Sequence, residues 1–166
     1  MALKVGDRIP EVGLLRKQGD GFETVELPDR LAGRKVVLFA VPGAFTGTCT
    51  SAHVPSFVRT RGQLADAGVD EIICVSVNDP FVMDAWGETT GAAAAGITML
   101  ADASAKYPKA AGLTLSIPAA GLHDRAVRHA LFADDGVVKV LHVENDSGVC
   151  ETTAGEVMLE AIRALN

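Results

Sequence analysis

Two continuous apolar runs set the strongest limit on how this chain can fold. Lys35–Val41 and Glu71–Val77 are short, rich in β-branched residues and almost uninterrupted by polar side chains. Strands of this kind lie inside a sheet whose two faces are both covered, usually by helices. The segment between them, Cys49 to about Ala67, has apolar residues at helical spacing, so the sequence predicts a strand–helix–strand unit.

The turn and cap residues define the other elements. Pro55 lies early in the intervening helix and predicts a distorted first turn or a kink. Asp79 followed by Pro80 predicts the capped start of a second helix. The remaining predicted elements are an N-terminal hairpin (Glu11–Arg16 and Phe22–Leu27), a strand at Ile97–Leu100, a short helix at Asp102–Gly112, a loop at Leu113–Asp124, a hairpin of His129–Ala133 and Val137–Val143 around Asp134-Asp135-Gly136, and a closing helix at Ala154–Leu165.

This order predicts an α/β fold, with a central mixed β-sheet, helices on both faces and an N-terminal β-hairpin. The length of 166 residues suits a single domain spanning residues 1–166, whose core needs neither a disulfide nor a metal. The three cysteines include no CxxC pair, so we expect free thiols in a reducing compartment.

Composition excludes several classes of partner. The formal net charge is −6 and no basic stripe is present, which argues against a nucleic-acid partner. No apolar stretch approaches the roughly 18 residues of a membrane span, so no membrane partner is expected. The N-terminal residues do not resemble a secretory signal. These features predict a cytoplasmic location, or an organellar one if a transit segment has been removed.

The segment Val41–Pro55 (VPGAFTGTCTSAHVP) holds the densest set of reactive side chains. It places Cys49 at or near the first turn of the predicted helix, where unpaired N–H groups and the helix dipole favour a thiolate. Thr46 offers a hydroxyl close by, either for a substrate or simply as a turn residue. The alternative interpretation of Cys49 is an inert buried thiol, which is the commoner role of a cysteine outside such a context. His53, one turn further on, either faces Cys49 or makes a structural hydrogen bond, and both readings stay open.

Several motifs resemble one enzyme family. They are PGAFTGTC at Pro42–Cys49, SVNDPF at Ser76–Phe81 and LAD at Leu100–Asp102, in this order. Together they resemble the type II (atypical two-cysteine) peroxiredoxins over nearly the whole chain. The resemblance implies a thioredoxin-like fold and thiol-dependent reduction of hydrogen peroxide and alkyl hydroperoxides, with no cofactor and no metal.

The resemblance also assigns roles. It implies that Cys49 is the peroxidatic cysteine, that Thr46 and Arg128 hold the peroxide oxygens, and that Pro42 shields the thiolate. An arginine suits this place because it stays protonated and presents several donors in a fixed fork. Arg125 is the alternative arginine. The family commonly has proline where this chain has Gly47, which predicts a looser loop and bears on the rate more than on the type of reaction.

Two other cysteines are candidates for the resolving thiol. Cys74 stands in the middle of a predicted strand, where a small core side chain is the default, but relatives carry a resolving cysteine at the matching position. Cys150 lies in a predicted loop and is either a resolving thiol or an incidental one. If neither resolves, a reductant such as glutathione with glutaredoxin, or thioredoxin, must attack the sulfenic acid.

Type II relatives usually form homodimers near the active-site loop. The resemblance therefore predicts a homodimer, with Phe45, Pro80, Phe81 and Leu115–Pro118 as interface candidates. The alternative from another class is a peroxide-sensing redox switch or a chaperone-like binding protein that uses the same Cys49. A thiol–disulfide oxidoreductase is the third hypothesis, and the missing CxxC pair argues against it.

Overall fold

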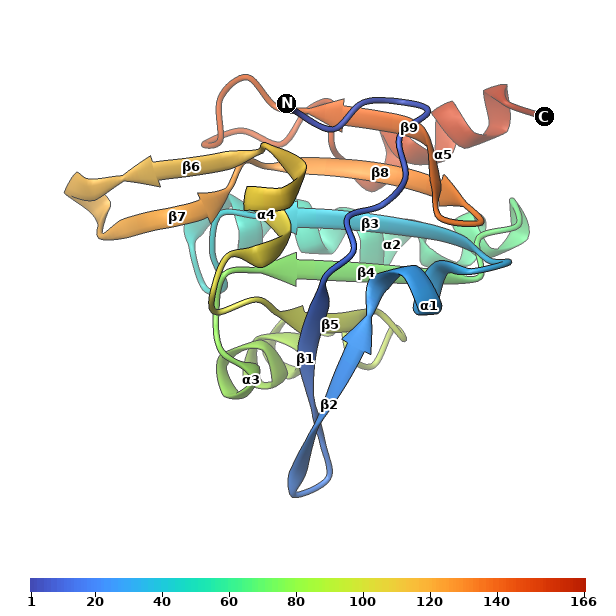
Figure 1. Ribbon diagram of the computed structural model, residues 1–166. Coiled ribbons are helices and arrows are strands. Elements are labelled where there is room, and N and C mark those ends of the chain that lie inside the picture. Colours follow the sequence, from blue (N-terminus) through green and yellow to red (C-terminus); the bar gives the residue numbers. More distant parts are fainter.

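A seven-stranded mixed β-sheet forms the centre of the computed structural model, which describes residues 1–166 (Figure 1). In spatial order its strands are β2 (Gly21–Glu26), β1 (Gly13–Gln18), β5 (Thr98–Ala101), β4 (Glu71–Ser76), β3 (Lys35–Val41), β8 (His129–Asp134) and β9 (Val137–Val143). β3, β4 and β5 are mutually parallel, whereas the other pairs are antiparallel. The predicted mixed sheet and N-terminal hairpin are therefore confirmed.

Helices cover both faces of this sheet. One face is covered by α2 (Val54–Asp66), α3 (Pro80–Thr90) and α5 (Gly155–Ala164), and the other by α1 (Leu27–Leu31) and α4 (Lys106–Ala111) (Figure 1). Successive residues of β3 point to opposite faces, so Phe39 packs in the apolar cluster of α2, α3 and α5, and Leu38 in that of α1 and α4. This double covering explains the unbroken apolar runs of the sequence. None of the helices is long and apolar enough to span a membrane.

The helix that carries Cys49 begins with one wide turn. Cys49–His53 (η1) is π-helical, with the Val54 N–H bonded to Cys49 O, and α2 continues from it. Pro55 provides the physical reason, because it has no N–H to donate and its ring crowds the carbonyl of Ser51, four residues earlier. The distortion predicted at Pro55 is thus confirmed, and it sets the position of Cys49.

One segment was predicted wrongly. The expected loop at Leu113–Asp124 is instead a two-stranded arm of β6 (Thr114–Ile117) and β7 (Leu122–Ala126), joined by the 3₁₀ turn η2 (Pro118–Ala120). The arm stands outside the main sheet (Figure 1). Most of its residues are exposed, so it lacks the alternation of buried and polar residues by which a sequence indicates strands. The short α1 was also missed, because five residues are too few to show a helical period.

The two ends of the parallel strands lead to different parts of the molecule. β3 pairs with β4 from Val36 opposite Glu71 to Val41 opposite Ser76. The loop to Cys49 leaves the carboxyl end of β3, on the left of Figure 1, whereas Glu71 begins β4 at the other end. The six residues of β4 therefore separate the two places by roughly 20 Å at about 3.3 Å per residue.

Candidate active site

Arg128 brings the reactive groups together. Its side chain is buried at 1% exposure, and Nη2 donates to Cys49 Sγ at 3.1 Å while Nη1 donates to His53 Nδ1 at 2.9 Å. Nε and Nη2 also donate to the carbonyl of Ser147, at 3.3 and 3.0 Å. None of these acceptors is a carboxylate, so the guanidinium charge is free to stabilise a negative charge on the sulfur. Arg125, the alternative arginine, does not bond to Cys49.

His53 serves as a hydrogen-bond acceptor for Arg128. Its Nε2 lies 3.1 Å from the carbonyl of Thr153, so Nε2 carries the proton and Nδ1 accepts from the guanidinium. Burial, and then the charge of Arg128, lower the pKa of His53 to about 3. The imidazole is therefore neutral at physiological pH. Of the two readings of His53, the structure shows the structural hydrogen bond, made to Arg128 and Thr153.

A buried carboxylate, Glu144, holds the loop that covers Arg128. It accepts from the N–H groups of Glu151 and Thr153 at 2.9 and 3.0 Å, and from the hydroxyls of Thr152 and Thr153 at 3.1 and 2.7 Å. Burial alone would raise the pKa of Glu144, but these hydrogen bonds, led by that of Thr153, outweigh it and lower the pKa. The loop thereby presents its carbonyls to Arg128 and His53.

Ser147, Thr153 and Glu144 were not predicted as site residues. Two of them act through backbone carbonyls, which every residue type possesses. The only sequence signal was a turn-like cluster at Asn145–Gly148, and it gives no indication of what the loop contacts.

The loop before Cys49 is fixed by hydrogen bonds from three directions. The Ala44 N–H donates to Asn78 Oδ1 at 3.0 Å, and Arg125 Nη1 donates to Pro42 O at 3.2 Å. Thr46 Oγ1 donates to Gly43 O at 2.7 Å, which leaves its oxygen as an acceptor. A side chain at Gly43 would collide, since an added Cβ would lie 2.9 Å from Arg125 Nη1 and 3.0 Å from Thr46 Cγ2.

The four predicted site residues, Cys49, Arg128, Thr46 and Pro42, thus lie in one region, but they differ in their contacts and burial. Cys49 and Arg128 are in direct contact. Thr46 is half-buried and is linked to the helix start by the Thr50 N–H, which donates to Thr46 O at 3.1 Å. Pro42 is buried where the loop leaves β3.

All three cysteines are free thiols in different surroundings. Cys74 is fully buried on β4, in the same apolar cluster as Cys49, and burial raises its pKa well above the ordinary value. Cys150 is half-buried with Sγ 3.7 Å from Thr153 Oγ1, and burial raises its pKa as well. No three His, Cys, Asp or Glu side chains gather closely enough to hold a metal ion.

A free thiol at a helix start, beside a buried arginine and on this sheet, defines a thiol-based redox protein. A family model described as Redoxin matches residues 4–158. Peroxiredoxin-2E-2, chloroplastic, of Oryza sativa subsp. japonica is 46% identical over 164 residues, which cover 96% of this chain and 72% of the relative. Peroxiredoxin-2D of Arabidopsis thaliana is 42% identical over 161 residues, which cover 96% and 98%. Reduced Prx3 from Vibrio vulnificus in complex with H₂O₂ matches with a TM-score of 0.90 and 41% identity, covering 97% of this chain and 96% of that one.

The chain therefore belongs to the peroxiredoxin family, in the type II branch that its motifs indicated. The thioredoxin-like fold expected from the resemblance is confirmed. Its activity is that of a thiol-dependent peroxidase.

Two buried histidines make the fold sensitive to acid. Besides His53, burial lowers the pKa of His129 to about 4, partly offset by its hydrogen bond to Val127 O. The unfolded chain protonates both near pH 6.5, so below that pH the unfolded state binds more protons than the folded state. Their contribution to stability is therefore complete above about pH 6.5 and is lost as the pH falls toward 4 and 3.

Between pH 7 and pH 5, we expect each of these histidines to lower the free energy of unfolding by about 2 kcal/mol. His53→Gln should remove about half of the drop that the two histidines cause together, because Gln does not titrate. His123→Gln, on an exposed histidine, should leave it unchanged. Urea unfolding followed by circular dichroism at both pH values measures the drop, and an equal drop in wild type and H53Q would contradict the assignment.

Proposed function

We propose that Cys49 is the peroxidatic cysteine of this thiol-dependent peroxidase. The observation that carries the proposal is the 3.1 Å contact between Cys49 Sγ and the guanidinium of Arg128, whose other observed partners are neutral. A cation buried without a counter-ion favours an anion beside it, and the thiolate is the reactive form of cysteine. The substrates we assign are hydrogen peroxide and alkyl hydroperoxides.

The reaction then runs as an in-line displacement. The Cys49 thiolate attacks one peroxide oxygen, an S–O bond forms and the O–O bond breaks. The departing oxygen takes up a proton from solvent, equivalent to the one that Cys49 released on ionising, and leaves as water or an alcohol, while Cys49 becomes a sulfenic acid. Arg128 stabilises the charge as it moves from sulfur to the departing oxygen. Thr46, with its proton on Gly43 O, accepts the hydrogen bond of the peroxide O–H, and the buried Pro42 shields the sulfur from water.

Arg128→Lys should lower the rate constant for oxidation by H₂O₂ by about 10²- to 10³-fold, since an ammonium cannot reproduce the fork that reaches Cys49, His53 and Ser147 together. Arg125→Lys is the matched control and should cost less than about tenfold, because Arg125 reaches the loop through a single bond to Pro42 O. Stopped-flow oxidation of the reduced proteins gives both constants. Equal losses in the two variants would refute the assigned role of Arg128.

An external thiol regenerates Cys49 in this proposal. Cys74 is locked in a central strand, and the raised pKa values keep both Cys74 and Cys150 protonated and weakly nucleophilic. A glutathione thiolate attacks the sulfenic sulfur and releases water, which leaves a mixed disulfide on Cys49. A second thiol, presented by glutaredoxin or supplied by glutathione, attacks the glutathione sulfur of that disulfide, forms a new disulfide with it and releases Cys49 as the thiol. Thioredoxin is the alternative reductant.

The Cys74→Ala, Cys150→Ala double variant should keep turnover with glutathione and glutaredoxin within about threefold of wild type, because neither thiol takes part. Peptide mapping of wild-type protein treated with peroxide and then glutathione should show the adduct on Cys49. A disulfide from Cys49 to Cys74 or to Cys150, together with a loss of turnover in the matching single variant, would replace this scheme with an internal resolving cysteine.

We propose a cytoplasmic location, in keeping with the three free thiols and the thiol reductant. Relatives named chloroplastic or mitochondrial make an organelle the alternative.

We also propose a homodimer formed at the end of the sheet that holds the Cys49 loop. Phe45 and Phe81 are 53% and 63% exposed there, and Ile117 of the β6–β7 arm is exposed too. Phe45 has a φ of 61°, which is unusual for a bulky residue, and its large apolar side chain is exposed. Pro80, expected on the same surface, is buried within its own chain, so that part of the expectation was wrong.

Light scattering after size exclusion should give a dimer at micromolar concentration. Phe81→Glu should give a monomer, because a carboxylate in the centre of an apolar interface is desolvated without a partner. Leu165→Glu, on an exposed residue near the C-terminus, should remain dimeric. A monomeric wild type would exclude the dimer.

A further inference from the structure

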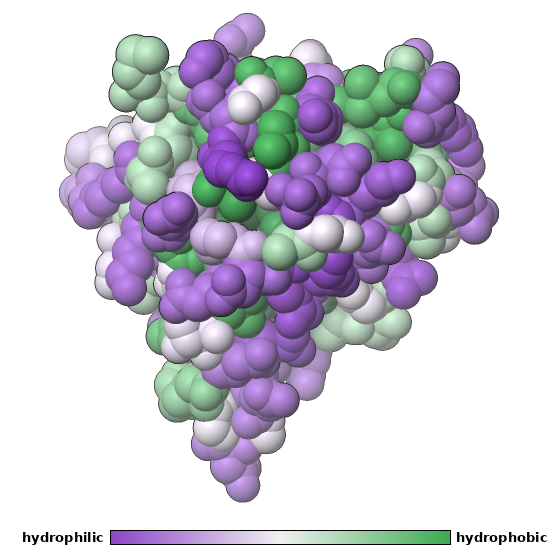
Figure 2. All heavy atoms as spheres, turned by 45° about the vertical axis from the view of Figure 1, so that its right-hand side comes forward, coloured by the Kyte–Doolittle hydropathy of each residue, from purple (hydrophilic) through white to green (hydrophobic).

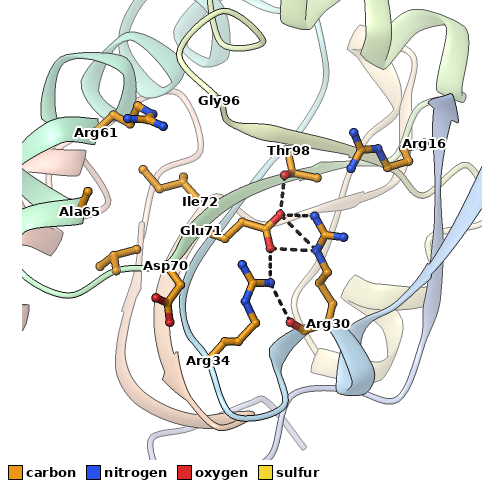
Figure 3. Close-up of a pocket in the computed structure, with 11 residues that line it drawn as sticks. Arg16, Arg30, Arg34, Arg61, Ala65, Asp70, Glu71, Ile72, Gly96 and Thr98 are labelled. Carbon is orange, nitrogen blue, oxygen red and sulfur yellow. Dashed lines mark hydrogen bonds and ion pairs between the residues drawn. The ribbon is translucent and has the colours of Figure 1, made fainter. Parts of the chain in front are cut away.

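Four arginines gather around a pocket of about 370 Å³ at the end of the sheet opposite Cys49 (Figure 3). Arg16 comes from β1, Arg30 from α1, Arg34 from the turn after α1, and Arg61 from α2. They are four of the 15 lysine and arginine residues of a chain whose formal net charge is −6. Figure 2, which turns the right-hand side of Figure 1 forward, shows hydrophilic residues over much of this side of the molecule. Such a concentration of one charge in an acidic protein requires an explanation.

Glu71 accounts for two of the four arginines. Its buried carboxylate accepts from Arg30 Nε and Nη2 at 2.9 and 2.7 Å, from Arg34 Nη1 at 2.7 Å, and from Thr98 Oγ1 at 2.5 Å (Figure 3). Burial alone would raise the pKa of Glu71, but these bonds, led by those of Arg30, lower it to about 2. One fully ionised acid thus faces two guanidinium groups, and its oxygens have no further need of donors.

The other two arginines are not needed by this acid. Arg16 has only Glu23 as an ionic partner, at 3.7 Å and with both side chains partly exposed. Arg61 makes neither an ion pair nor a side-chain hydrogen bond, and its guanidinium lies beside Gly96 at the pocket wall. The second acid at the pocket, Asp70, accepts from the backbone N–H of Lys35 at 2.8 Å. The lining therefore holds four positive charges against two negative ones, with guanidinium N–H groups left without acceptors.

We propose that this pocket binds a small phosphate-bearing anion. Guanidinium forks match the oxygens of phosphate in geometry and charge, and here they approach from β1, α1 and α2. The two oxygens of the Glu71 carboxylate already engage Arg30, Arg34 and Thr98, whereas a tetrahedral phosphate offers more oxygens, on several sides, to donors that come from separate elements. The volume lies at the lower end of small-molecule pockets, and Ala65 and Ile72 supply an apolar wall for an organic part.

The pocket is separate from the peroxidase chemistry. It lies at the amino end of β4, where Glu71 lines it, and the length of β4 separates it from the loop of Cys49. A ligand there would contact α1, α2 and the amino end of β4, and would bind only the folded protein. Its binding should therefore raise thermal stability without changing the rate at which Cys49 is oxidised.

Isothermal titration calorimetry with sodium pyrophosphate tests the proposal, with sodium chloride at matched ionic strength and sodium acetate as comparison salts. We expect pyrophosphate to bind with a Kd below about 1 mM, and acetate to bind at least about tenfold more weakly. The Arg16→Gln, Arg61→Gln double variant should weaken pyrophosphate binding at least about tenfold, because it removes the two cations that Glu71 does not use. Arg163→Gln, an exposed arginine on α5, is the matched control and should bind like wild type. Arg30 and Arg34 stay intact because the buried Glu71 requires them.

Three results would overturn the proposal. One is the absence of saturable binding up to about 10 mM pyrophosphate at constant ionic strength. Another is equal affinity in the double variant and in R163Q, which would place the anion elsewhere. The third is acetate binding as tight as pyrophosphate binding, which would replace the phosphate with a carboxylate. Thermal melts of each variant establish that it is folded, and none of these outcomes depends on peroxidase activity.

Discussion

The contact between the buried guanidinium of Arg128 and the sulfur of Cys49 is the interaction on which the candidate active site depends. The observed acceptors of the guanidinium are a thiol, an imidazole and a carbonyl, all of them without formal charge. Burying a cation in this way is costly unless an anion is formed nearby, and Cys49 is the contacting group able to supply one. The same requirement explains the contacts that His53 makes with Arg128 and Thr153. His53 must stay neutral to accept from Arg128, and its depressed pKa ensures that it does.

Two carboxylates organise the surroundings of arginines in opposite ways. Glu144 binds no arginine. It ties together the backbone and hydroxyls of the loop that delivers Ser147 O to Arg128, so the guanidinium keeps its charge for the sulfur. Glu71, at the other end of β4, accepts hydrogen bonds directly from Arg30, Arg34 and Thr98 and needs no further donor. One end of the sheet thus has a cation facing the sulfur of Cys49, and the other has a surplus of cations around an open pocket.

Much of the fold could be predicted because its signals are local. The unbroken apolar run of β3 required a sheet covered on both faces, Asp79 capped α3 through the Val82 N–H at 2.9 Å, and Pro55 distorted the helix it enters. The β6–β7 arm was missed because it lacks such local signals: exposed strands outside the sheet show little alternation of apolar and polar residues. Within the site, Cys49 could be chosen from the motif around it, and the family resemblance favoured Arg128 over Arg125, whereas the carbonyls that hold Arg128 could not be predicted.

The sequence by itself determined the candidate cysteine, Cys49, the helix that presents it and the mixed sheet beneath, because residue type and spacing at adjacent positions decide such features. Only the tertiary structure decided which arginine meets the sulfur, since Arg125 and Arg128 are three residues apart and differ only in what surrounds them. It alone also gathered the arginines around Glu71 from separate elements. Contacts between residues distant along the chain follow from the packing of the whole sheet, and no local pattern specifies them.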